Sequence, residues 1–330
     1  MQFTQQIISV KALGINISER HTHIAFPEEN CIKIVILSYK QRLNPDDAVE
    51  IGKRIVDIQQ ALEANSQEKS TLSVISVPVY LSVMQISQIL ECCQVIGFHV
   101  TRVMSDLSAA SIYSLYLKKD DKSEENLVIC FKKNYRRISL GICNELDGDV
   151  CEILSHQKYQ SPQQLIDFFT KQQDGKQDTY SIWSFPSKDE FSLLYKVISF
   201  GEHNNKKFYQ TVLYPLLSRI ADKEEIQFVH EPYFPVLGAL VQSAVFIGAI
   251  HDILLLDIHP YSYGVSITGE QEMYYCQNCW KQVDVLFINH TWSVNHNKTI
   301  NDTKKTMNTS ECNSRWLKEN NNAAIISMIR

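Results

Sequence analysis

The chain of 330 residues lacks the features of membrane and secreted proteins. It contains no run of 18 apolar residues, so we expect no membrane span and no membrane partner. Its start, MQFTQQIISVKALG, has no charged opening followed by a long apolar block, which argues against a secretory signal. Nine cysteines in such a chain are expected to be reduced thiols, and we expect a cytoplasmic location.

An excess of basic charge is also missing. The net charge of -5 argues against a general nucleic-acid-binding protein, which would normally have a basic face. A matched set of zinc ligands is absent too, since the Cys276–Cys279 pair is followed by His290, His296 and Cys312 at irregular spacing. We therefore expect neither a nucleic-acid partner nor a metal site.

What is present is a globular composition, with 44% hydrophobic and 21% charged residues, in a chain long enough for two lobes. Strands are expected at 7–17, 20–26, 31–38, 71–80, 98–104, 127–131, 137–143, 150–156 and 179–185. Helices are expected at 44–64, from after Pro78 through Cys93, and at 106–117, 161–172, 188–200, 203–221 (with a kink at Pro215) and 235–250. This alternation predicts a two-lobed α/β fold. We expect strands 72–77, 127–131 and 137–143 to share one sheet.

Three segments carry motif-like sequences. Residues 73–110 read SVISVPVYLSVMQISQILECCQVIGFHVTRVMSDLSAA, residues 238–248 read GALVQSAVFIG, and residues 252–268 read DILLLDIHPYSYGVSIT. In the same order, they resemble three segments of the heat-shock-70 (DnaK-type) chaperone family. These are A-V-I-T-V-P-A-Y-F with its helix and G-L-N-V-L-R-I-I-N-E-P-T-A-A, then G-A-A-V-Q-A-A-I-L-S-G, and finally the interdomain linker, D-L-L-L-L-D-V-T-P-L-S-L-G-I-E-T.

The resemblance implies a shortened form of the actin-like, ribonuclease-H-like two-lobed ATPase-domain fold. It divides the chain into lobe I (1–160), a remnant of lobe II (161–250), the linker with the first strand of a β-sandwich (251–270), and a tail (271–330). The tail is rich in Asn, Thr and Lys, and we expect it to be disordered. About seventy residues follow the linker, too few for the family's substrate-binding half.

The linker residues that match the family are Asp252, Leu254, Leu255, Leu256 and Asp257. In the family this apolar strip docks on the ATPase domain in one nucleotide state and is released in another. The alternative is an ordinary buried strand, which a short apolar run usually indicates. Exposure of three leucines would be unfavourable, so we expect this segment to be docked on its own lobe or on a partner.

The family's first phosphate-binding turn, G-I-D-L-G-T-T, corresponds to residues 14–20 here. Gly14 is kept, whereas Asn16 replaces the aspartate that holds the metal's water shell, and Ser18 replaces a glycine. Glu19 adds a negative charge near the expected phosphate position. The side chain of Ser18 restricts a turn that must bring backbone N–H groups close to phosphate.

The second turn, I-F-D-L-G-G-G-T-F-D-V-S, corresponds to 129–139, where no glycine or aspartate remains. Lys132 and Lys133 could attract a phosphate as point charges, or this stretch could be a solvated hairpin loop. Asp106 stands in place of the glutamate of E-P-T and is the remaining candidate for a catalytic group. The adenosine motif G-G-S-T-R and the segment bearing the catalytic lysine have no counterpart.

The sequence therefore predicts a chaperone-associated binding or regulatory module, a pseudo-ATPase with lost or weak nucleotide binding, because the loss of several phosphate-stabilising elements would leave little activity. Its expected partners are proteins: co-chaperones, chaperones or ribosome-associated factors. The alternative is an ATP-dependent folding chaperone with atypical phosphate loops, in which ATP or ADP with Mg²⁺ would be the ligand. A third interpretation is a decayed gene product without a stable role.

Overall fold

The structure is a computed structural model that describes most of the chain up to residue 257 and short strands beyond it. The described ranges are 12–28, 31–65, 72–118, 126–133, 137–146, 149–173, 188–201, 205–221 and 226–257, with further strands between 264 and 329. The chain divides into a first unit, residues 1–177 with 185–258, and a second unit, residues 178–184 with 259–330.

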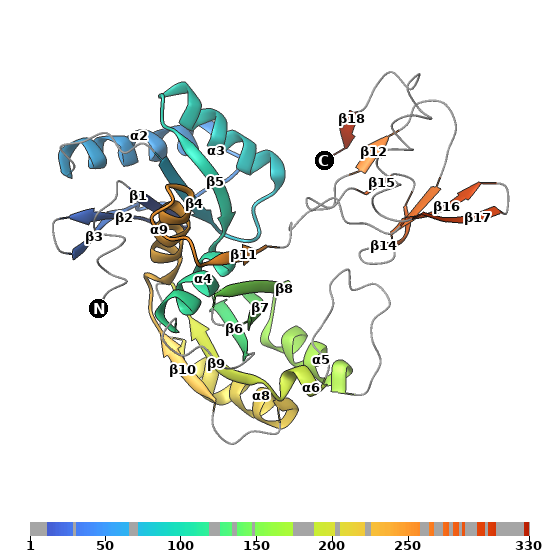
Figure 1. Cartoon of the computed structure of the whole chain (residues 1–330). Helices are drawn as coiled ribbons and strands as arrows, with labels where there is room; N and C mark the ends of the chain where they lie inside the picture. Colours follow the sequence, from blue (N-terminus) through green and yellow to red (C-terminus); the bar gives the residue numbers. More distant parts are fainter. Residues whose placement is uncertain are drawn as a thin grey trace. The chain divides into compact units, whose positions relative to one another are not determined.

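The first sheet of the first unit is formed by residues before α4 (Figure 1). Its strands are β1 (Ala12–Ile17), β2 (His21–Glu28), β3 (Cys31–Ser38), β4 (Leu72–Val77) and β5 (Val100–Ser105), in the order β3-β2-β1-β4-β5. β1 pairs antiparallel with β2 and parallel with β4; β2–β3 is antiparallel and β4–β5 is parallel.

Helices α2 (Ala48–Asn65) and α3 (Val83–Val95) pack on this sheet through one hydrophobic cluster. The Asp47 side chain accepts hydrogen bonds from the backbone N–H groups of Val49 and Glu50, which caps α2. Ser82 and Gln85 form a capping box at the start of α3.

The second sheet repeats the same arrangement of strands. Its strands are β6 (Asn126–Lys133), β7 (Ile138–Leu146), β8 (Val150–Tyr159), β9 (Leu194–Ser199), β10 (Gln227–His230) and β11 (Leu254–Leu256), in the order β10-β9-β6-β7-β8-β11. β6–β7 and β7–β8 are antiparallel, whereas β6–β9 and β9–β10 are parallel. Counted from β6, the order third-second-first-fourth-fifth and the strand directions are those of the first sheet.

The helices of this half are short. They are α5 (Pro162–Gln173), α6 (Lys188–Phe191), α7 (Lys206–Phe208), a π-helix η1 (Tyr209–Leu213) and α8 (Tyr214–Ala221). Side chains of several of these helices pack with β6, β7 and β9 in a second hydrophobic cluster. The chain stays helical through Pro215, which lies at the start of α8 directly after the π-helix.

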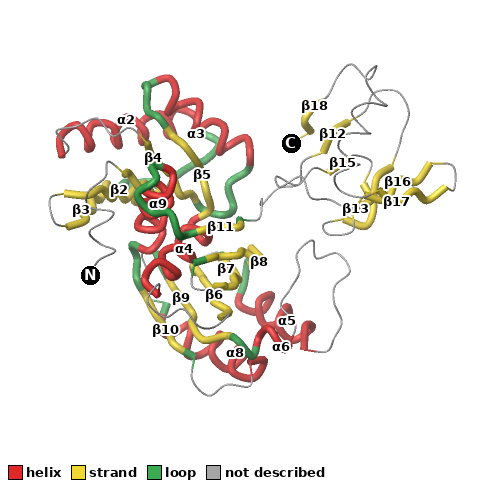
Figure 2. Tube along the Cα trace, viewed as in Figure 1, coloured by secondary structure: helices red, strands yellow, loops and turns green. Residues whose placement is uncertain are grey.

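Two helices join the sheets (Figure 2). α9 (Phe234–Phe246) packs on β1 and β4, α4 (Asp106–Lys118) packs on β6, β7 and β8, and the two helices pack on each other. They are in close contact at Gly238, where an added Cβ would lie 1.7 Å from the carbonyl oxygen of Ala109. A glycine is therefore required for this crossing.

Two expectations about strands are wrong. β4 lies in the first sheet and β6 and β7 in the second, so 72–77 does not share a sheet with 127–131 and 137–143. The expected helix at 188–200 ends at Phe191, and β9 follows as a strand between β6 and β10. A strand that is buried on both faces has a continuous apolar sequence. Periodicity alone does not distinguish such a sequence from that of a buried helix.

The second unit contains only short strands among its described residues. β12 (Gly264–Ser266), β15 (Leu286–Phe287) and β18 (Ser327–Ile329) pair in one sheet. β13 (Met273–Cys276), β14 (Trp280–Val283), β16 (His296–Ile300) and β17 (Thr303–Met307) pair in another. Disorder of the remaining tail stays a prediction. The expected strand 179–185 and the side chains of Cys276, Cys279, His290, His296 and Cys312 lie outside the described part of the chain.

Other expectations concern the chain as a whole. The free thiols of the first unit are Cys31, Cys92, Cys93, Cys130, Cys143 and Cys151. Among the described residues, no helix has the length and apolarity needed to cross a bilayer.

Candidate functional site

The residues of the expected first phosphate turn pack and form hydrogen bonds within the protein. Gly14 lies on β1 beneath α9, where an added Cβ would be 2.4 Å from the backbone nitrogen of Leu240, so this glycine serves helix packing. The buried Asn16 amide donates to the Ser76 hydroxyl at 2.9 Å. The Ser18 hydroxyl donates to the carbonyl of His21 at 2.8 Å and closes its own turn.

Glu19 is likewise bound within the chain. Its carboxylate accepts a hydrogen bond from the Tyr80 hydroxyl at 3.1 Å and lies 3.8 Å from Arg42. Burial, and then the charge of Glu19, raise the pKa of Tyr80. The Arg137 guanidinium lies over the Tyr80 ring, 4.9 Å from its centre. Glu19 therefore bridges to the Pro78–Leu81 turn.

The second expected phosphate turn contributes a buried lysine. The Lys132 ammonium lies 3.1 Å from a carboxylate oxygen of Asp106, and both side chains are buried. The other Asp106 oxygen accepts the backbone N–H of Val79 at 3.3 Å. The expectation of a solvated loop is thus wrong for Lys132. Lys133, the next residue, lies over the ring of Phe208 at 5.2 Å.

A glycine makes room for the Lys132 side chain. Gly201 has φ +101°, a conformation that favours glycine, and the Lys132 methylenes lie 3.5 Å from where its Cβ would be. This glycine is not part of a phosphate turn of the family. It allows a lysine to reach Asp106 from the end of β6.

The segment 252–257 lies on the second sheet. β11 pairs parallel with β8, with Leu254 opposite Val150 and Leu256 opposite Glu152, and the Leu254 N–H donates to Asp149. The segment is therefore docked on its own lobe, as expected. The three leucines are not all buried: Leu255 packs on the core, while Leu254 is 52% and Leu256 43% exposed. Backbone pairing, rather than burial of every leucine, holds the segment.

The charged ends of this segment differ. Asp252 is exposed. Asp257 accepts a hydrogen bond from the Ser108 hydroxyl at 2.8 Å and forms an ion pair with Arg102 at 3.3 Å. Because Ser108 follows Asp106 by two residues on α4, the same helical turn binds both Lys132 and the segment 252–257.

A buried histidine completes this arrangement, which we call the α4 junction: Asp106, Ser108, Lys132, His156 and Asp257. His156 Nε2 lies 3.3 Å from the Ser108 hydroxyl oxygen. Burial, and then the charge of Lys158, lower the pKa of His156 to about 3, so the imidazole is neutral. Asp257 binds Ser108 and not His156 Nδ1, which is unlike a hydrolase triad.

The sequence predicts part of this site. The resemblance singles out Asp106, Lys132 and Asp257, and the structure brings them together through α4. It does not bring Gly14, Asn16 or Ser18 into the junction. His156 has no signal in the sequence, because a histidine within an apolar strand is more often a core residue than a functional one.

Across the described residues, no cluster of three His, Cys, Asp or Glu side chains is arranged to hold a metal ion. In comparisons with known proteins, no protein-family model and no curated protein matches this chain.

Proposed function

We propose that this chain is a shortened, divergent protein of the heat-shock-70 type that acts as a protein-binding or regulatory module without an ATPase cycle. The observation that carries the proposal is the buried Lys132–Asp106 ion pair. In the resemblance, Lys132 corresponds to the family's second phosphate turn and Asp106 to its E-P-T acid.

The repeated strand order supports an actin-like, ribonuclease-H-like fold. Each sheet has three antiparallel strands followed by two parallel ones in the order third-second-first-fourth-fifth. A helix from each half, α4 and α9, lies where the halves meet. This doubling is the arrangement that the resemblance implies for the two lobes of an ATPase domain.

ATP with Mg²⁺ does not fit the residues present. Asn16 and Ser18 donate their side-chain hydrogens within the chain, and Glu19 would repel a phosphate. The charge of Lys132 is offset by Asp106, and separating a buried ion pair costs about 3–5 kcal/mol. A phosphate would have to displace Asp106 without the backbone N–H groups that a glycine turn supplies.

The segment 252–257 would then be held in one state. In the family, nucleotide binding changes whether this strip is docked. Here Asp257 is bound to the same helical turn as the Lys132–Asp106 pair, and no nucleotide would be there to disturb that turn. We infer a permanently docked segment whose exposed leucines face co-chaperones, chaperones or ribosome-associated factors.

The alternative is an ATP-dependent folding chaperone with atypical phosphate loops, located in the cytoplasm like the proposed module. A steady-state phosphate-release assay on the full chain separates the two. We expect release at the rate of buffer alone. Turnover that exceeds this rate and is lost in Asp106→Asn would favour the chaperone.

A further inference from the structure

Side chains connect the two sheets of the first unit in addition to α4 and α9. We call the first sheet with α2 and α3 the first half, and the second sheet with its helices the second half. Asp106 directly follows β5 in the first half, and Lys132 on β6 pairs with it at 3.1 Å. Arg137, directly before β7, lies over the ring of Tyr80 in the turn after β4. Two strand ends of the second half thus each place a cation against the first half.

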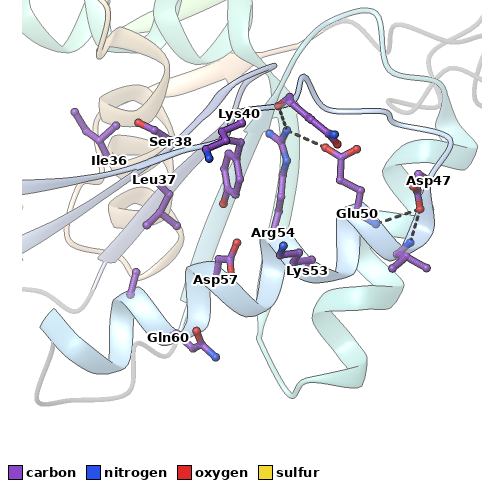
Figure 3. A pocket seen from close by; sticks show the side chains of 14 residues that line it. Ile36, Leu37, Ser38, Lys40, Asp47, Glu50, Lys53, Arg54, Asp57 and Gln60 are labelled. Carbon is purple, nitrogen blue, oxygen red and sulfur yellow. Dashed lines mark hydrogen bonds and ion pairs between the residues drawn. The ribbon is translucent and has the colours of Figure 1, made fainter.

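The turn Pro78–Leu81 is held firmly on the first half. The Tyr80 hydroxyl donates to the Glu19 carboxylate at 3.1 Å. The backbone of Glu19 is fixed in turn, because the buried Arg54 donates to its carbonyl oxygen at 3.0 Å. Arg54 also pairs with Glu50 on α2 at 2.9 Å, in the groove that Figure 3 shows. The Tyr80 ring is therefore a fixed surface on which a group from the second half can pack.

The backbone of the same turn is tied to the buried ion pair. The Val79 N–H donates to one carboxylate oxygen of Asp106 at 3.3 Å, and the Lys132 ammonium donates to the other at 3.1 Å. One carboxylate thus holds both the turn of the first half and the lysine of the second. The ion pair and Arg137 act on consecutive residues of this turn, so a movement of the second half away from it would break both contacts.

Both cations belong to one antiparallel pair of strands. Lys133 lies opposite Ile138 in the register of β6 and β7, so Lys132 and Arg137 flank the same end of this pair. The pair lies within the second sheet and not at its edge, because β9 pairs with β6 and β8 pairs with β7. A contact made at this end therefore holds the sheet as a whole.

We propose that these contacts form a latch that keeps the two halves closed on one another without a ligand. The latch consists of Arg137 on the Tyr80 ring together with Lys132 on Asp106. Without it, halves that are joined by packed helices can move by hinge or shear motions. The inference does not rest on the resemblance, and the latch can exist whether or not the chain binds a nucleotide.

The test is the distance distribution between two spin labels, measured by pulsed electron spin resonance on the full chain. Labels attached through a non-natural amino acid at Gln60 on α2 and at Gln210 on η1, both exposed, leave the native cysteines unmodified. We expect one narrow distribution for the otherwise unchanged protein. Arg137 is exposed, so Arg137→Glu leaves the core intact. It should add a population at longer distance, because Glu19 repels the new charge.

Three further variants separate the latch from a general effect of charge. Arg137→Lys keeps a cation over the ring and should keep the narrow distribution. Arg219→Glu, at an exposed arginine on α8, is the matched control and should also keep it. Tyr80→Leu removes the ring and should again give the longer distance. A broad distribution in the unchanged protein, a narrow one in Arg137→Glu or in Tyr80→Leu, or equal broadening in Arg219→Glu would each overturn the proposal.

Hydrogen exchange of the Val79 N–H gives a second readout, because this group is bound to Asp106 while the halves are closed. We expect its exchange to be about fivefold faster in Arg137→Glu, the factor for loss of an exposed cation–π contact, with unchanged exchange in α2. An unchanged rate at Val79 would contradict the latch. Neither measurement includes a nucleotide, so the latch and the proposed loss of ATPase activity can fail independently.

Discussion

At the scale of the residue, the charge of Lys132 lies inside the protein. Lys132 and Asp106 are both buried, and each offsets the charge of the other. A buried ion pair adds little compared with an apolar pair, but the loss of one partner leaves an uncompensated charge. The pair therefore constrains both positions together.

Replacing Lys132 with Met should lower the free energy of unfolding by about 3–5 kcal/mol, because Asp106 is left buried without its cation. The double variant with Asp106→Asn should lose less than the sum of the single losses, and urea unfolding of the full chain measures each value. Lys207→Met on the surface is the control, expected within about 0.5 kcal/mol. Additive losses would contradict the coupling of the pair.

His156 predicts a dependence of stability on pH. Its folded pKa of about 3 lies below the unfolded value near 6.5, so the unfolded chain binds the extra proton. Stability from this group is therefore full above pH 6.5 and is lost as the pH falls toward 3. The slope, up to about 1.4 kcal/mol per pH unit, should be absent from His156→Gln when urea unfolding is compared between pH 4 and 6. Parallel curves for the two proteins would argue against a neutral His156.

At the scale of the element, the crossing of α4 and α9 depends on Gly238. An Ala at this position would place its Cβ against the carbonyl of Ala109, and the two helices would have to separate. The structure therefore explains a glycine in the middle of an otherwise buried helix, where Gly usually disfavours helix formation.

Gly238→Ala should lower the free energy of unfolding by about 3 kcal/mol, at the upper end of the usual cost of overpacking. Gly52→Ala in α2 is a matched control, because its Cβ would lie 3.8 Å from the Cys92 sulfur, an ordinary contact distance. We expect this control to gain about 0.5–1 kcal/mol from helix propensity. Thermal and urea unfolding measure both, and a stabilised Gly238→Ala would contradict the close crossing.

The pairing of β11 with β8 leads to a different prediction for each leucine. Leu255→Asp should weaken the docking, because Leu255 packs on the core, whereas Leu254→Asp should have a small effect because that side chain is half exposed. Hydrogen exchange at residues 254–256 measures the docking. Equal exchange in both variants and the unchanged protein would mean that the leucines do not hold the segment.

The sequence predicts the elements whose patterns are local and misses those set by tertiary contacts. The patterns of residues 44–64 and 106–117 predict α2 and α4, although α2 begins at Ala48 after an Asp47 cap and not at residue 44. The run 188–200 is not, because its second half becomes a strand only between β6 and β10. Likewise the proposed resemblance draws attention to Asp106 and Asp257, while His156 reaches Ser108 through strand pairing that no local pattern encodes.

At the scale of the whole molecule, the first unit has two sheets of the same topology joined by α4 and α9. In the proposed fold, a nucleotide between such halves would couple them to the segment that follows. Here one turn of α4 carries both the Lys132–Asp106 ion pair and the Ser108–Asp257 hydrogen bond. Side-chain contacts therefore connect this turn to the segment 252–257 without a nucleotide. We therefore propose that this chain has no nucleotide cycle.

Calorimetric titration of the full chain with Mg-ATP and Mg-ADP measures whether the protein binds either nucleotide. We predict no heat of binding for either nucleotide up to 1 mM, an affinity at least about a hundredfold weaker than the resemblance implies, because the phosphate-binding groups are bound to one another. Saturable binding of either nucleotide below about 10 µM, weakened by Asp106→Asn, would contradict it.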